Sequence, residues 1–146
     1  MSVSPNVNIN VWIVEDDEGD VHLLRRGFED FKADVKLFFC KSAPELVNRL
    51  SRGGTSGNMQ GPLPDVILLD INLPGVDGFS ACRYIRSREP LKNIPIIFLT
   101  GRKALEDVQA AIRAGGNYYF VKPVDFQKLM EKIRELVSLS PKDQSG

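Results

Sequence analysis

The sequence has few of the residues that would indicate a covalent staple, a membrane segment or a secreted protein. It contains only two cysteines, Cys40 and Cys82, and neither lies in a metal-ligand spacing, so both are expected to be reduced, buried side chains. No stretch approaches the roughly 18 apolar residues of a membrane span. Residues 1–10 also lack the charged start and apolar middle of a signal peptide. We therefore expect a cytoplasmic protein.

The chain also lacks net charge. Lys plus Arg and Asp plus Glu number 19 each, so no overall field attracts nucleic acid or an anionic membrane, and neither is expected as a partner. His22 is the only histidine, and it falls beside the apolar stripe of a helical pattern, so it is expected to be an exposed side chain rather than a reactive one. With 146 residues, the chain has room for one domain with a substantial core.

Short apolar runs alternate with segments of helical period along nearly the whole chain. This pattern is typical of repeated strand–helix units. It predicts an α/β fold: a doubly wound, five-stranded parallel sheet in the flavodoxin-like order 2-1-3-4-5, with helices on both faces. The second run contains Lys36, which favours an edge position. The expected strands are Asn8 to Val14, Val35 to Cys40, Asp65 to Asp70, Pro95 to Leu99 and Tyr118 to Val121.

The helical segments lie between these runs, and polar residues suited to capping precede two of them. Ser42 is a candidate cap of the second helix and Asp125 of the last. Residues 52–64 are rich in Gly, Ser, Asn and Pro and are interpreted as a flexible insertion, either functional or mere padding. The domain is expected over residues 8–139, with tails at 1–7 and 140–146. The expected helices are about 19–31, from 44 onward, 78–87, 104–114 and 125–139.

Four of the apolar runs end on polar residues that suit phosphoryl chemistry. The first runs into Glu15 and Asp16, the third into Asp70, the fourth into Thr100 and the fifth into Lys122. Because ligands of open α/β sheets bind outside the carboxyl ends of the strands, these groups are expected to surround one crevice. Each of them alone has an ordinary interpretation, as a loop residue, a helix cap or a solvated charge, but together they predict a site.

The carboxylates predict a metal ion in that crevice. Glu15, Asp16 and Asp70 would repel one another unless a hard cation lay among them, and Mg²⁺ is the usual ion where carboxylates share a phosphate. Asp70 could then act as a nucleophile that forms an aspartyl phosphate, with Mg²⁺ and the Lys122 ammonium group neutralising the phosphoryl oxygens. Thr100 and the amide that follows it could donate hydrogen bonds to one of those oxygens.

Four motifs that carry these residues resemble the receiver domain of two-component response regulators. They read IVEDD at 13–17, LLDINLPGVDG at 68–78, IIFLTG at 96–101 and YYFVKPVD at 118–125, and the resemblance covers about residues 11–137. The segments GDVHLLRRGF and NYYFVKPVDF are similar to those of single-domain receivers that partner bacterial phytochrome kinases. Glu15 replaces the more common Asp, and Arg102 stands where receivers vary, two residues after the conserved Thr.

The resemblance assigns a role to each residue of the set. Asp70 would be the phosphoacceptor, and Lys122 would pair with the phosphoryl group. Thr100 would contact the phosphoryl oxygen and move with it, and Tyr119 would change rotamer with Thr100. The metal ligands implied for Mg²⁺ are Asp16, Asp70, the backbone carbonyl of Asn72 and, through water, Glu15.

These roles imply a phosphoprotein that switches protein–protein interactions. The expected phosphoryl donor is a sensor histidine kinase or a histidine phosphotransfer protein, and the face of the fourth helix, fifth strand and fifth helix is the expected site of homodimerisation. The chain would catalyse only its own phosphorylation and dephosphorylation, as a stand-alone receiver. Two alternatives stay open: a phosphorylation-independent scaffold and an Mg²⁺-dependent phosphohydrolase, although Asn72 stands where such hydrolases have an acid/base Asp.

Overall fold

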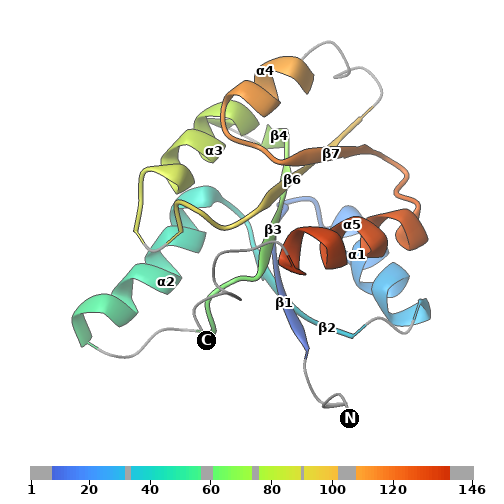
Figure 1. Ribbon diagram of the computed structural model, residues 1–146, viewed down its shortest axis with the longest axis horizontal. Coiled ribbons are helices and arrows are strands. Elements are labelled where there is room, and N and C mark those ends of the chain that lie inside the picture. The colour runs from blue at the N-terminus through green and yellow to red at the C-terminus, as the bar shows by residue number, and fades with distance from the viewer. Residues whose placement is uncertain are drawn as a thin grey trace.

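The central feature of the computed structural model is a parallel sheet of five strands (Figure 1). The structure describes residues 8–31, 34–56, 61–73, 76–89, 91–101 and 108–138. The order β2-β1-β3-β6-β7 confirms the predicted 2-1-3-4-5 arrangement, and β2 is an edge strand as expected. The strands are β1 (Ile9–Val14), β2 (Val35–Cys40), β3 (Val66–Asp70), β6 (Ile96–Thr100) and β7 (Tyr118–Val121).

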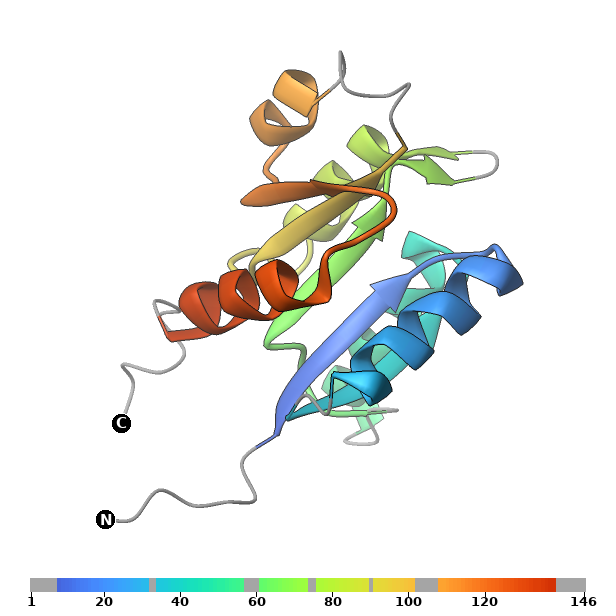
Figure 2. The ribbon, with the colours of Figure 1, turned by 90° about the vertical axis from the view of Figure 1, so that its right-hand side faces the viewer.

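Helices cover both faces of this sheet, so the core has two halves (Figure 2). On one face, α1 (Glu18–Asp30) and α5 (Phe126–Ser138) pack against alternate residues of the strands, such as Ile13 and Leu68. On the other, α2 (Ala43–Ser56) and α3 (Gly78–Arg86) pack against Trp12 and Ile67. The strands β1, β3 and β6 are therefore buried on both sides, which explains their uninterrupted apolar runs.

The helix ends follow the capping signals of the sequence. Ser42 Oγ accepts a hydrogen bond from the Glu45 amide at 3.2 Å, and Asp125 Oδ1 accepts one from the Lys128 amide at 3.2 Å. In α1, Asp17 is the N-cap, and its carboxylate accepts a hydrogen bond from the Asp20 amide at 2.8 Å. These bonds satisfy amides that the first turn of a helix leaves without an intrahelical partner.

Two details differ from the sequence expectations. First, α2 continues through Ser56, so the beginning of the segment expected as a flexible loop is helical; glycine lowers helix stability by only about 1 kcal/mol per residue and does not end a helix by itself. Second, a short hairpin of β4 (Asn72–Leu73) and β5 (Val76–Asp77) follows Asp70. The helix expected over 104–114 is described as α4 only over Val108–Arg113, and residues 104–107, like Arg102 before them, lie outside the described residues.

Gly78 fixes the position of the hairpin relative to the sheet. Its amide donates a hydrogen bond to the Ile71 carbonyl at 2.8 Å. A Cβ atom at Gly78 would lie 2.6 Å from the Ile71 Cα, so only glycine permits this approach. The chain therefore returns to the end of β3 just after leaving it, which holds the Asp70 segment between the sheet and the start of α3.

A membrane-spanning segment is not found among the helices of the described residues, since none is both long and apolar enough. The sole tryptophan, Trp12, is fully buried and stacks on Phe38 with ring centroids 4.8 Å apart. His22 is exposed on α1, as expected, and both cysteines are buried and free of disulfides.

Candidate phosphoryl-transfer site

The polar ends of the strands meet at one edge of the sheet, as predicted. The Glu15 amide donates to the Cys40 carbonyl at 2.9 Å, which continues the β1–β2 ladder by one residue. Asp70 lies beside Leu99 in the register of β3 and β6. The Lys122 amide donates to the Thr100 carbonyl at 2.8 Å, so the end of β7 is held beside the end of β6. The backbone thus brings the side chains of four strands toward one place.

Lys122 forms the centre of the site. Its Nζ atom lies 3.2 Å from Glu15 Oε1, 2.9 Å from Asp20 Oδ2 and 3.3 Å from Asp70 Oδ2. The three carboxylates differ in exposure: the side chain of Glu15 is 1% exposed, that of Asp70 8% and that of Asp20 34%. An ammonium group carries three N–H donors, and here each has one carboxylate to bind.

The electrostatics of this cluster are dominated by burial and by like charges. Burial and the negative charge of Asp70 raise the pKa of Glu15 to about 7, although Lys122 and the Asp17 amide act in the opposite direction. Burial lowers the pKa of Lys122, but the hydrogen bond to Asp20 and the charges of Asp70 and Glu15 outweigh it, and the pKa is raised. The lysine is therefore a permanent cation, and the carboxylates are incompletely neutralised.

Asp20 is the member of this cluster that the sequence reasoning missed. It lies in the first turn of α1, and its carboxylate is the nearest of the three to Lys122 Nζ. One oxygen each from Glu15, Asp20 and Asp70 lie within 4.8 Å of one another. No local sequence pattern indicates this contact, because Asp20 reaches Lys122 only through the packing of α1 beside the end of β7.

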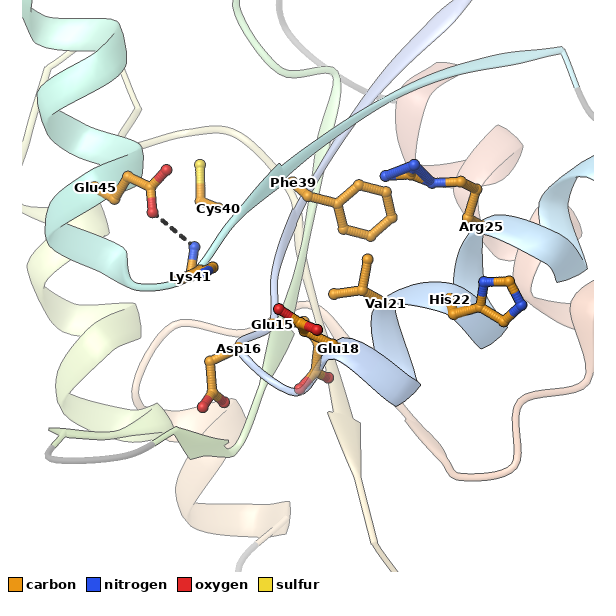
Figure 3. Close-up of a pocket in the computed structure, with 10 residues that line it drawn as sticks. All are labelled: Glu15, Asp16, Glu18, Val21, His22, Arg25, Phe39, Cys40, Lys41 and Glu45. Carbon is orange, nitrogen blue, oxygen red and sulfur yellow. Dashed lines mark hydrogen bonds between the residues drawn. The ribbon is translucent and has the colours of Figure 1, made fainter.

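Asp16 is separated from the Lys122 cluster. It is half-buried and lines a neighbouring pocket of about 420 Å³ with Glu15 at its edge (Figure 3). Side chains of α1, such as His22 and Arg25, form one side of this pocket, and the start of α2 with Glu45 forms the other (Figure 3). Phe39 lies between them. The metal role expected for Asp16 stays a prediction.

The remaining predicted residues have the following positions. Thr100 is fully buried, and its hydroxyl group donates to the Gly101 carbonyl at 3.0 Å. Tyr119 is 37% exposed on β7 and stacks on Tyr118 with ring centroids 5.8 Å apart. Asn72 belongs to β4, where it pairs with Asp77. The structure therefore shows Tyr119 in an outward orientation and Thr100 bonded to its own chain.

The donor set fits a hard divalent cation. Three carboxylates face a single ammonium group, so the cluster retains an excess of negative charge. Carboxylate oxygen atoms are the ligands that Mg²⁺ prefers, and it usually binds to one or two of them while sharing a phosphate. Burial and the charge of Asp70 raise the pKa of Glu15, so a cation bound beside it would favour its ionised form.

A buried aspartate and a lysine thus meet at the carboxyl ends of parallel strands in a doubly wound α/β domain, with further acidic groups beside them. The sequence model of the response regulator receiver domain matches residues 11–134, and this chain belongs to that family. Receiver domains are signalling domains of two-component systems. Among curated proteins, response regulator PleD of Caulobacter vibrioides is 32% identical over 111 residues, which are 74% of this chain and 24% of PleD. The chain thus spans about a quarter of that relative.

Solved structures support the same assignment. Bacteriophytochrome response regulator RtBRR is 31% identical, with a TM-score of 0.72 over 89% of this chain and 78% of that one. Response regulator Rcp1, solved in an Mn²⁺-bound form, is 28% identical, with a TM-score of 0.65 over 89% of this chain and 92% of that one. The structural neighbours therefore include a bacteriophytochrome response regulator, as the sequence motifs indicated.

Proposed function

We propose that this chain is a receiver that accepts a phosphoryl group on Asp70 and, once phosphorylated, changes its binding to other proteins. The observation that carries the proposal is the 3.3 Å contact between Lys122 Nζ and Asp70 Oδ2 at the end of β3. A carboxylate held against a permanent cation at this edge can accept a phosphoryl group whose charge the cation then shares.

The proposed reaction is a phosphoryl transfer. A carboxylate oxygen of Asp70 attacks the phosphorus atom, and the bond from phosphorus to the donor breaks. With a phosphohistidine donor the leaving group is the imidazole of a histidine kinase or phosphotransfer protein; with acetyl phosphate it is acetate. Water later cleaves the acyl phosphate and returns Asp70 and inorganic phosphate. Lys122 would donate a hydrogen bond to a phosphoryl oxygen throughout.

We also propose that Mg²⁺ is required. Asp16, Asp70, the Asn72 carbonyl and, through water, Glu15 would hold it, and the ion would neutralise charge on the phosphoryl oxygens. The acidic cluster supports this proposal, as does the metal bound in Rcp1.

The output surface that we propose is formed by α4, β7 and α5. Ile112, Tyr118 and Tyr119 are each between 37% and 39% exposed there, and Lys132 Nζ lies 4.1 Å from the centre of the Tyr118 ring. On phosphorylation, Thr100 would turn its hydroxyl group toward the phosphoryl oxygen, and Tyr119 would move inward. This change would alter the surface that meets a partner or a second copy of the chain.

The test is intact mass spectrometry after incubation with acetyl phosphate and Mg²⁺. Wild type should gain the mass of one phosphoryl group, which hydroxylamine removes. Asp70→Asn should gain none, whereas Asp30→Asn should behave as wild type, because Asp30 is exposed at the far end of α1. Equal labelling of the Asp70 variant would refute the site. If wild type is not labelled under conditions that label another receiver, the phosphorylation-independent scaffold is favoured; rapid release of phosphate from many substrates would favour a phosphohydrolase.

Metal dependence and the switch need separate measurements. Labelling should disappear with EDTA and return with Mg²⁺, and Asp16→Ala should need more Mg²⁺ for half-maximal labelling. Lys122→Ala should keep part of the uptake but lose any change in partner binding or in the oligomeric state measured by light scattering. Unchanged coupling in that variant would contradict the role given to Lys122.

A further inference from the structure

We infer that Asp20 is a positioning residue: its carboxylate holds the Lys122 ammonium group in the unphosphorylated state and must release it before Lys122 can bind the incoming phosphoryl group. The inference rests on the proposed function, and it concerns a residue that the four sequence motifs do not include. It gives α1 a direct part in the rate of phosphoryl uptake.

The geometry shows why Lys122 cannot simply add a fourth partner. Its three N–H donors already have three acceptors, in Glu15, Asp20 and Asp70. A phosphoryl oxygen on Asp70 needs one of those donors. One of the existing hydrogen bonds must therefore be exchanged as the transition state forms.

Exposure decides which hydrogen bond is exchanged. Glu15 has a side chain that is 1% exposed, so water cannot replace the ammonium group there, and a buried acceptor without a partner is costly. Asp70 carries the phosphoryl group and stays near Lys122. Asp20 is 34% exposed, so water can solvate its carboxylate as soon as Lys122 leaves. The bond to Asp20 is also the shortest of the three, at 2.9 Å, so it is a contact of the resting state that opposes the reaction.

The position of Asp20 is itself fixed by the fold. The Asp20 amide donates to the Asp17 carboxylate at 2.8 Å, within the cap of α1. The Asp20 side chain therefore extends from a helix turn that the cap holds in place. Lys122, by contrast, extends on a long side chain from the end of β7 and can shift between acceptors.

This assignment predicts an effect on one direction of the reaction. Removing an interaction that exists in the ground state but is lost in the transition state accelerates the step. Asp20→Asn should therefore raise the rate of phosphorylation by acetyl phosphate about three- to fivefold, the range that fits a partly exposed ion pair. The loss of phosphate should keep its wild-type rate, because in the phosphorylated protein Lys122 has already left Asp20.

The experiment measures both rates at Mg²⁺ concentrations that saturate each variant, by stopped-flow fluorescence or quenched mass spectrometry. Glu18→Gln is the matched control, since it removes one negative charge from the same turn of α1 and no hydrogen bond joins Glu18 to Lys122 among the contacts of the described residues. It should remain within a factor of about 1.5 of wild type, a change small against that of a lost ion pair. Asp20→Glu keeps the charge and should restore a rate close to that of wild type.

A readout without metal or phosphate tests the resting contact directly. The ¹H–¹⁵N signal of the Lys122 Nζ ammonium group should be visible at low temperature in wild type and in Glu18→Gln, because a persistent ion pair slows proton exchange. It should be broadened in Asp20→Asn. An unchanged signal would overturn the inference.

The kinetic outcomes are equally decisive. If Asp20→Asn slows both the uptake and the loss of the phosphoryl group, Asp20 orients Lys122 in the transition state, and the inference is wrong. The inference is also wrong if neither rate changes, or if Glu18→Gln accelerates uptake as much as Asp20→Asn does. If wild type takes up no phosphoryl group at all, the proposed function fails instead, while the ammonium signal still shows whether Asp20 holds Lys122.

Discussion

Arg86, at the end of α3, offers the sharpest test of how the fold is held together. Its guanidinium group uses all five N–H donors. Nε and Nη2 donate to the Gly115 carbonyl at 3.0 and 2.7 Å, and Nη2 also donates to Asn117 Oδ1 at 2.8 Å. Nη1 donates to the carbonyls of Lys92 and Ile94 at 3.0 and 2.5 Å. One side chain thus joins the end of α3 to the segments that enter β6 and β7.

The cost of removing Arg86 follows from the exposure of its acceptors. The bonds to Lys92 and Asn117 are exposed, and water can replace them. The bonds to Ile94 and Gly115 are partly buried, so Arg86→Ala leaves acceptors without a donor. At about 1–2 kcal/mol for each buried acceptor, and with lost packing added, Arg86→Ala should lower the free energy of unfolding by about 3 kcal/mol.

The assay is urea unfolding followed by the fluorescence of Trp12, which is fully buried, with circular dichroism as a second probe. Arg86→Lys should recover little, because three N–H donors on a single nitrogen atom cannot span the planar set of acceptors. Arg88→Ala is the control: its guanidinium group lies over the Tyr84 ring at 4.9 Å, on the surface, and its loss should cost less than about 0.5 kcal/mol. A loss below about 1 kcal/mol for Arg86→Ala would refute the reasoning.

Three further predictions concern packing, thiols and pH. Gly27→Ala should destabilise the fold by about 1–3 kcal/mol in urea unfolding, because its Cβ would lie 2.1 Å from the Phe126 ring of α5; a gain in stability would contradict this packing. Burial raises the pKa of Cys40 to about 11 and also raises the pKa of Cys82. Both thiols should therefore resist iodoacetamide at pH 8 until the protein is unfolded, as peptide mass mapping would show. Without metal, wild type should lose stability relative to Glu15→Gln as the pH rises from about 4.5 to about 7, because a raised pKa in the folded state favours folding only while Glu15 is protonated. Thermal unfolding at several pH values measures the difference in stability between the two proteins. A difference that does not vary with pH would refute this prediction.

The sequence predicted the part of the site that the backbone alone determines. Parallel strands end at the same edge of a sheet, so Glu15, Asp70 and Lys122 had to approach one another once the strands were located. Their contacts in the structure confirm that they meet. The order of the strands could be predicted from the doubly wound pattern of alternating strands and helices. The edge position of β2 could be predicted because buried strands show uninterrupted apolar runs, whereas the run of β2 contains Lys36.

The sequence could not assign the side chains whose direction depends on tertiary packing. Glu15 and Asp16 are consecutive, and neighbouring residues of an extended chain point to opposite sides, so only Glu15 reaches Lys122. Asp20 reaches it because α1 packs where its first turn faces the end of β7, which no local pattern specifies. Ile112 of α4 is apolar but 39% exposed, and its residue type alone does not indicate whether another element covers it.

The two ends of strands β6 and β7 are held by different kinds of polar contact. This difference bears on how the protein switches. Where β6 and β7 begin, uncharged acceptors fix the chain: Arg86 binds carbonyls, and Asn117 Oδ1 accepts from the Ile96 amide at 2.9 Å as well. Where the strands end, Lys122 is held by charged carboxylates that differ in exposure and can exchange. A phosphoryl group added to Asp70 therefore changes the contacts at the carboxyl ends of the strands. The contacts of Arg86 and Asn117 meanwhile keep the beginnings of β6 and β7 in place. The movement of Thr100 and Tyr119 that we propose would accordingly be confined to the ends of these strands and to the face beside them.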